Sequence, residues 1–182
     1  MNILEIFINS ILLIISLDKE LWDIILLSLF VSFTALIFAS IFGFLAGYIF
    51  ALYDFYLKKF LLVILNSLMG IPPVVVGLIV YFILASGGPL GVLQLLYTPT
   101  AMIIAQTIII FPIVASLSHE IFLKNWIEFK DQIRSLNIPF LGAVKILITH
   151  SYFLLITTLL SAFGRAISEV GAVMIVGGNI DH

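Results

Sequence analysis

The chain has 182 residues, of which 63% are hydrophobic and 10% are charged, and its mean hydropathy is +1.29. A soluble domain carries about 25% charged residues, so this composition excludes an ordinary water-soluble fold and predicts a protein that lies mostly in lipid. The net charge of −2 comes without a basic tail, which argues against nucleic acid as a partner. The chain contains no Cys, which excludes disulfides and thiolate metal sites.

The first elements in chain order are an amphiphilic N-terminal segment and a series of long apolar stretches. Residues 1–20 carry Glu5 near their start and lack the positive region and cleavage site of a signal peptide, so we expect an interfacial helix there. A membrane-spanning helix needs roughly 20 mostly apolar residues. The stretches that satisfy this are 21–53, 60–85, 98–117 and a last one that runs from His150 into 163–169. The expected fold is all-α and polytopic, with about four transmembrane helices.

Two features within these stretches predict special packing. Gly43 and Gly47 form a Gly-x-x-x-Gly pair, a close-packing surface for another helix, with dimerisation as one use of it. Pro72 and Pro73 interrupt the second stretch. Irregular backbone at membrane depth is tolerated only against protein or a water-filled cavity. The bend therefore either faces a translocation path or is a packing kink, and both readings stay open.

Orientation follows from the positions of Lys and Arg in the short loops. Six of the eight cations lie in the loops after the first and third stretches: Lys58, Lys59, Lys124, Lys130, Arg134 and Lys145. Loops 54–59 and 119–149 are therefore predicted to be cytoplasmic, with the N-terminus outside.

The second of these loops holds a polar island, "EFKDQIRSLNIPFLGAVK" at 128–145, which we call the elbow. Residues 119–136 suit a helix, Asn137 tolerates the left-handed conformation that ends one, and Pro139 cannot continue it. A second short helix is expected to start near Pro139. The elbow is either a solvated loop or a helix offered to the groove of a soluble partner.

Within the elbow, Asp131-Gln132-Ile133 is followed by Asn137 and then by Leu147-Ile148-Thr149-His150. This spacing resembles the coupling loop of type-1 ABC importer permeases, whose pattern is Glu-Ala-Ala, three residues, Gly, nine residues and Ile-x-Leu-Pro. The resemblance implies that an ATPase docks on the elbow. The implied docking residues are Asp131, Gln132, Arg134, Ser135, Asn137 and Pro139.

The membrane segments 66–117 and "FGRAISEVGAVMIVGGNI" (163–180) resemble the corresponding regions of tungstate-type oxyanion permeases, relatives of the molybdate and sulfate ones. The resemblance implies a permease subunit of an ATP-driven importer in a prokaryotic plasma membrane, for tungstate or, alternatively, molybdate or sulfate. It implies three protein partners: a cytoplasmic ABC ATPase, an extracellular solute-binding protein and a second permease copy. Members continue past Gly-Asn-Ile with one more span, so 21–182 is expected to be a C-terminally truncated transmembrane domain.

Arg165 and Glu169 are ionisable residues at membrane depth, which usually pair or line a wet cavity. They form either an internal ion pair or part of the oxyanion path, and a direct bond is not assumed because Arg before Glu is the weaker order on a helix. The residues proposed for the path are Pro72, Pro73, Arg165, Ser168, Glu169 and Asn179.

Chemistry-bearing motifs are otherwise missing from the sequence. It contains no Gly-x-x-x-x-Gly-Lys-Ser/Thr phosphate loop, no nucleophile–base pair and no metal constellation. We therefore expect no enzyme activity, cofactor or metal, and energy supplied by a partner. The rival functions are a stand-alone channel or secondary carrier, and a non-transporting scaffold or inactive fragment.

Overall fold

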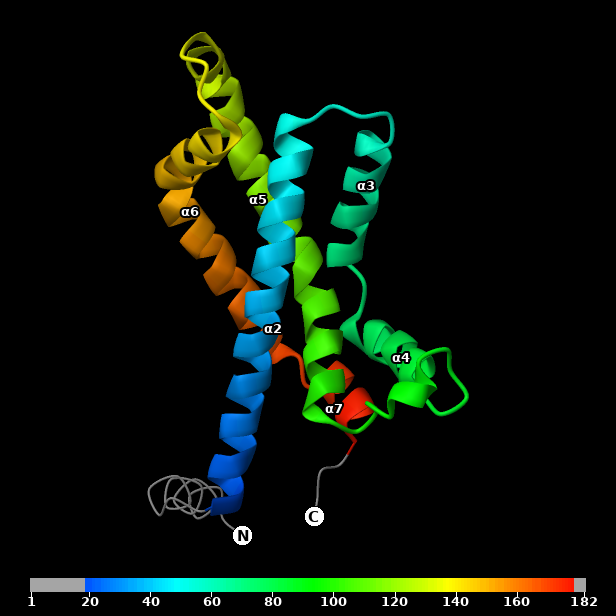
Figure 1. The fold of residues 1–182 in the computed structure, drawn as a ribbon. Helices are drawn as coiled ribbons and strands as arrows, with labels where there is room; N and C mark the ends of the chain where they lie inside the picture. Colours follow the sequence, from blue (N-terminus) through cyan, green and yellow to red (C-terminus); the bar gives the residue numbers. More distant parts are fainter. Residues whose placement is uncertain (1–18, 179–182) are drawn as a thin grey trace.

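The computed structural model describes residues 19–178, and these form only helices and connecting turns (Figure 1). The helices are α2 (Lys19–Leu52), α3 (Lys58–Met69), α4 (Pro73–Leu84), α5 (Pro99–Ser135), α6 (Phe140–Ser168) and α7 (Gly171–Gly177), with a 3-10 turn η1 (Gly91–Leu93) before α5. The predicted all-α architecture is confirmed. The interfacial helix expected in residues 1–20 lies outside the described residues, except that Lys19 and Glu20 begin α2.

Three of the described helices, α2, α5 and α6, are long and apolar enough to cross a membrane. The pair α3 and α4 is bent by 105° at the break between them and counts as a broken span or a re-entrant loop. The bend falls where Pro72 precedes Pro73, because a proline disfavours helical backbone in the residue before it; Pro72 itself is extended, with φ −58° and ψ 126°. The expected count of about four spans is therefore confirmed when the bent pair is taken as one.

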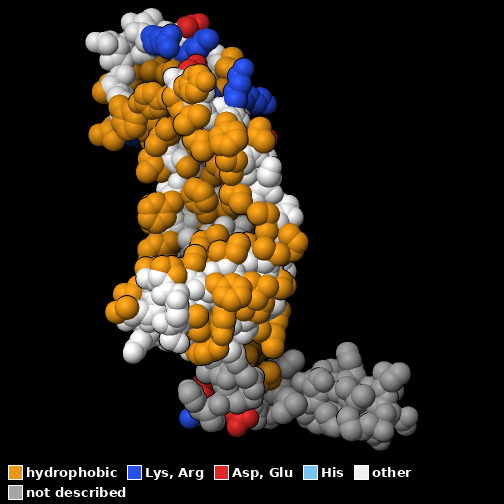
Figure 2. Space-filling view, turned by 90° about the vertical axis from the view of Figure 1, so that its right-hand side faces the viewer, with side chains coloured by type: hydrophobic (Ala, Val, Ile, Leu, Met, Phe, Trp, Pro, Cys, Tyr) orange, Lys and Arg blue, Asp and Glu red, His pale blue; other side chains and the backbone are white. Residues whose placement is uncertain are grey.

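The core is a column of side chains along α5, which packs against α2, α6 and α7. At its middle, small residues dominate the buried cluster, and this lets the helix backbones approach closely. That cluster consists of Ala35, Ala39, Ile109, Ile110, Val114, Ala162, Ala166 and Ala172. Exposed apolar side chains of α2 include Phe30 and Ile37, and hydrophobic side chains form a broad band on the face shown in Figure 2.

Gly43 and Gly47 are buried where α2 meets α5 of the same chain. A Cβ added at Gly43 would lie 2.8 Å from the Val114 side chain, and one at Gly47 would lie 2.8 Å from the His119 backbone nitrogen. The close-packing surface is thus confirmed, but its use for dimerisation is wrong, because α5 already occupies it.

Two helices continue beyond the ends of the predicted spans. The stretch expected to end at Leu117 continues as helix to Ser135, and the stretch expected to begin near His150 is already helical at Phe140. Hydropathy marks the depth of the lipid, whereas the polar residues from Glu120 to Arg134 include good helix formers and contain no breaker. α5 and α6 therefore extend beyond the apolar layer, and the elbow consists of their ends rather than of two separate short helices.

The turn at 53–57 and the turn at 136–139 lie at one end of the molecule, at the top of Figure 1. We call this the elbow end. The start of α2, the 85–98 connection and α7 lie toward the opposite end, called the far end. Lys and Arg side chains gather at the elbow end above the apolar band (Figure 2). The predicted pairing of the two cation-rich loops on one side is confirmed by this arrangement.

Candidate translocation site and coupling elbow

The elbow is closed by local backbone chemistry. α5 ends at Ser135 with Leu136 as its cap, and Asn137 has a φ of +50°. The Asn137 backbone N–H donates to the Arg134 carbonyl at 3.1 Å, and the Ile138 N–H donates to the Ile133 carbonyl at 3.0 Å. Pro139 is extended and immediately precedes α6. The predicted left-handed turn at Asn137 is confirmed, and the second helix starts directly after Pro139, as expected.

The tip of the elbow combines charged and apolar exposed side chains. The residues predicted to dock an ATPase are all exposed: Asp131, Gln132, Arg134, Ser135, Asn137 and Pro139. Beside them Leu136 is 71% exposed and Leu141 is 77% exposed. The Arg134 guanidinium lies 5.9 Å from the centre of the Trp126 ring, a cation–π distance that holds it against α5. This surface projects beyond the apolar band.

The elbow is also tied to the rest of the fold. The Asn125 side-chain amide donates to the Ser151 hydroxyl, which links α5 to α6. The Phe140 ring at the start of α6 packs edge-to-face on Tyr48 of α2, with ring centres 5.4 Å apart. The elbow, which joins α5 and α6, is therefore also in contact with α2.

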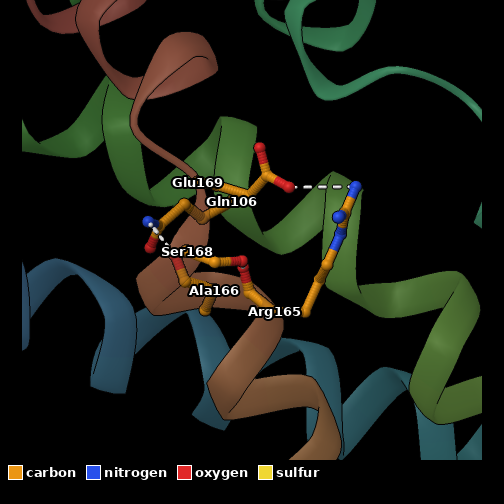
Figure 3. Close-up of polar contacts among 5 residues, drawn as sticks. All are labelled: Gln106, Arg165, Ala166, Ser168 and Glu169. Carbon is orange, nitrogen blue, oxygen red and sulfur yellow. Dashed lines mark hydrogen bonds and ion pairs between the residues drawn. The ribbon is translucent and has the colours of Figure 1, made fainter.

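Arg165 and Glu169 form an ion pair at the end of α6, with Nη2 of the guanidinium 2.9 Å from Oε1 of the carboxylate (Figure 3). Glu169 lies just beyond the helix, with φ −89° and ψ 91°. The helical rule that disfavours this order does not apply to a carboxylate outside the helix, so the pair forms in spite of it. The Ser168 hydroxyl donates a hydrogen bond to the Arg165 backbone carbonyl at 2.9 Å.

Gln106 was not among the predicted site residues, yet it holds this end of α6 in place. Its side-chain Nε2 donates to the Ala166 carbonyl at 3.0 Å (Figure 3), while its Oε1 is buried without a hydrogen-bond partner. Gln106 is 3% exposed. Gln106 could have been found from the sequence, because it is an amide side chain within an otherwise apolar stretch. A polar residue at membrane depth needs a partner.

Two cavities meet the ion pair from different sides. The first, which we call the bend cavity, measures about 440 Å³. Its lining comprises Phe42, Leu68, Met69, Ile71, Val76, Thr107, Ile108, Ile109, Phe111, Pro112 and Arg165. It lies at the α3–α4 break, so the predicted bend does face a cavity, through the neighbours of Pro72 and Pro73.

The second, the far cavity, measures about 660 Å³ and is lined by α2, α5 and the α6–α7 junction. Its polar lining residues are Glu20, Asp23, Ser28, Ser32, Gln106 and Glu169. Among the proposed path residues, Arg165 thus lines one cavity and Glu169 the other, Ser168 is exposed beside them, and Asn179 lies outside the described residues. Within residues 19–178, no group of three or more acidic or His side chains could hold a metal.

The fold and site together define a polytopic α-helical membrane protein with a sharply bent helix pair, an ion pair between two cavities and a helix–turn–helix elbow beyond the apolar layer. No family model matches the chain. It is 42% identical over 168 residues to the tungstate uptake system permease protein TupB of Peptoclostridium acidaminophilum, covering 92% of this chain and 74% of that protein. The chain therefore belongs to the ABC transporter permeases, in the group that includes tungstate uptake permeases.

Two further relatives agree with this assignment. A probable anion ABC transporter permease protein of Haloferax volcanii is 37% identical over 84% of this chain and 66% of its own length. A second TupB, from Campylobacter jejuni subsp. jejuni, is 38% identical over 71% of this chain and 54% of its own length. The chain thus spans about two thirds or less of these two relatives and about three quarters of the first.

Proposed function

We propose that the chain is the membrane-spanning subunit of an ATP-driven importer and that its substrate is a tetrahedral oxyanion, tungstate before molybdate or sulfate. The observation that carries the proposal is the similarity to a tungstate uptake permease along 92% of the chain. The chain contains no phosphate loop of its own, so the energy would come from a separate ATPase.

The elbow is the proposed seat of that ATPase. A docking surface needs an apolar centre and a polar rim, and the elbow exposes both apolar side chains, Leu136 and Leu141, and the polar side chains of Asp131, Arg134 and Asn137. Because the Asn125–Ser151 and Tyr48–Phe140 contacts tie it to three spans, closure of the ATPase would move these helices as a unit. With the elbow in the cytoplasm, the far end would face outward toward a solute-binding protein.

Arg165 supports a path through the bend cavity. Its side chain is 37% exposed although it lies in the last turn of the candidate span α6. A guanidinium at this depth faces water or protein rather than lipid. A wet bend cavity, closed on its open side by a second permease copy, would satisfy that requirement. Alternating access would then open this cavity to each side in turn.

The test is uptake by proteoliposomes that contain the permease, its ATPase and its solute-binding protein. We expect ATP-dependent accumulation of tungstate, with molybdate and sulfate as competing anions. A stand-alone channel or carrier would instead move the anion without the ATPase. Accumulation that is independent of ATP, or absent for all three anions, would exclude the proposed importer.

A further inference from the structure

Arg165 lies between two cavities that differ in charge. Among the described residues that line the bend cavity, Arg165 is the only charged one. The far cavity carries the carboxylates of Glu20, Asp23 and Glu169, and none of its described lining residues is Lys or Arg. A dianion is attracted to the first cavity and repelled by the second. Charge therefore places an anion on the bend-cavity side of the ion pair.

The guanidinium has donors to offer there. Arginine carries five N–H donors in a planar fork that matches oxyanions. The ion pair with Glu169 is made through Nη2, and within residues 19–178 no other hydrogen bond or ion pair involves this guanidinium. An oxyanion in the bend cavity can therefore contact this fork.

Glu169 can leave Arg165 without unwinding a helix. It occupies the short break between Ser168, the last residue of α6, and Gly171, the first residue of α7. On the other side of the break the end of α6 is fixed, because Gln106 on α5 holds the Ala166 carbonyl. Rotation at the break would carry the carboxylate away while α6 and Arg165 stay in place.

We propose that Arg165 is an anion-binding residue in the bend cavity, that Glu169 is its resident ligand, and that the transported oxyanion displaces this carboxylate. The inference rests on the proposed function, and it adds the class of ligand and the exchange between a side chain and the substrate. The bound dianion and the displaced carboxylate of Glu169 repel each other, so Arg165 binds the anion only weakly. Weak binding suits a path that must release its substrate.

The exchange has a mechanical consequence at the bend. α7 follows Glu169 directly and packs against α4, where a Cβ on Gly77 would lie 2.9 Å from the Cα of Ala172. α4 begins at Pro73 and contributes Val76 to the lining of the bend cavity. Displacement of Glu169 thus moves the element that shapes the cavity, and occupancy of the site is coupled to its shape.

The experiment uses the assembled transporter and tungstate as the probe. Glu169→Gln removes the resident carboxylate, and we expect tungstate binding to the solubilised permease–ATPase complex to tighten at least about fivefold, within the usual range of coupling between two ligands. Glu120→Gln removes an exposed carboxylate near the elbow end and is the matched control, with unchanged binding. Affinity that is unchanged or weaker in Glu169→Gln would overturn the proposal.

The second variant exchanges the two charges, Arg165→Glu with Glu169→Arg. It keeps an ion pair but moves the cation to the far-cavity side. We expect a thermal midpoint near that of the wild type together with loss of tungstate binding and uptake. Uptake at the wild-type level would show that the pair is only structural. A wild-type complex that accumulates no oxyanion would instead count against the proposed function, so the two failures are distinguishable.

Discussion

Arg165 and Glu169 are 2.9 Å apart across the end of α6, yet the two side chains line different cavities. The guanidinium is 37% exposed and the carboxylate 10% exposed. The pair therefore separates the apolar cavity under the α3–α4 bend from the acidic cavity at the far end. The pair lies at the junction of the long helix α6 and the short helix α7.

The amide of Gln106 should matter because it holds the end of α6 next to that pair. Gln106→Ala leaves the Ala166 carbonyl without its donor, and we expect a loss of about 1 kcal/mol in stability, as for other hydrogen bonds between membrane helices. Uptake should fall more than stability, because Arg165 loses its fixed position. Thermal unfolding and proteoliposome uptake check this.

The control for Gln106 is Thr157→Val. The Thr157 hydroxyl donates only within its own helix, to the Phe153 carbonyl, so its loss should leave the junction intact. If both variants reduce uptake equally, Gln106 has no special role in positioning α6.

Gly47 should not tolerate a side chain, since α5 packs directly on it. In Gly47→Ala the new Cβ would lie 2.8 Å from the His119 nitrogen and 2.9 Å from the Ala115 carbonyl oxygen. Both are backbone atoms, so relief requires a shift of the helix, and we expect a cost of about 1–3 kcal/mol. The thermal midpoint of the purified protein measures it. Gly164→Ala is the matched control, because its Cβ would meet nothing within 4 Å; an equal loss there would contradict the explanation.

Charge reversal at the elbow should disconnect the ATPase and leave the permease folded. In Asp131→Arg with Arg134→Glu, both changed side chains are exposed, and exposed substitutions usually alter stability by no more than about 0.5 kcal/mol. We expect co-purification of the ATPase to be lost. Lys59→Glu, an exposed charge reversal in the first turn of α3 at the elbow end, should retain the ATPase. Retention of the ATPase by the double variant would show that it docks elsewhere.

The turn between α2 and α3 should lose an ion pair in acid. The Lys58 ammonium donates to Asp54 at 2.8 Å, and this hydrogen bond and its charge lower the pKa of the Asp54 carboxyl from 3.8. A lowered pKa means that the stabilisation is present above the ordinary pKa and is lost as pH falls through the lowered one. The difference in thermal midpoint between wild type and Asp54→Asn should therefore be small, since Asp54 is exposed, and should disappear in acid. A difference that grows in acid would contradict this pairing.

The elbow turn and the α3–α4 bend were predictable from the sequence, because each depends on the conformational preferences of single residues. Asn137 adopts a left-handed turn and Pro139 precedes a new helix because these preferences belong to the residues themselves. The break at Pro72 and Pro73 was predictable for the same reason. The full length of α5 was not predictable in this way. Hydropathy indicates which residues lie in lipid, but a helix can continue into water as long as its backbone hydrogen bonds continue.

The sequence by itself determined that this protein is helical and lies in a membrane, since lipid requires apolar side chains and backbone groups paired within each segment. It also determined which loops share one side. Only the tertiary structure decided that Gly43 and Gly47 receive α5 rather than a second copy, and that Gln106 holds the end of α6. Only the tertiary structure decided that Arg165 and Glu169 bond each other while lining separate cavities. The reason is physical. The residue types of a Gly-rich face or a charged pair limit the kind of neighbour that can pack there, but the packing of helices distant in sequence determines which neighbour is present.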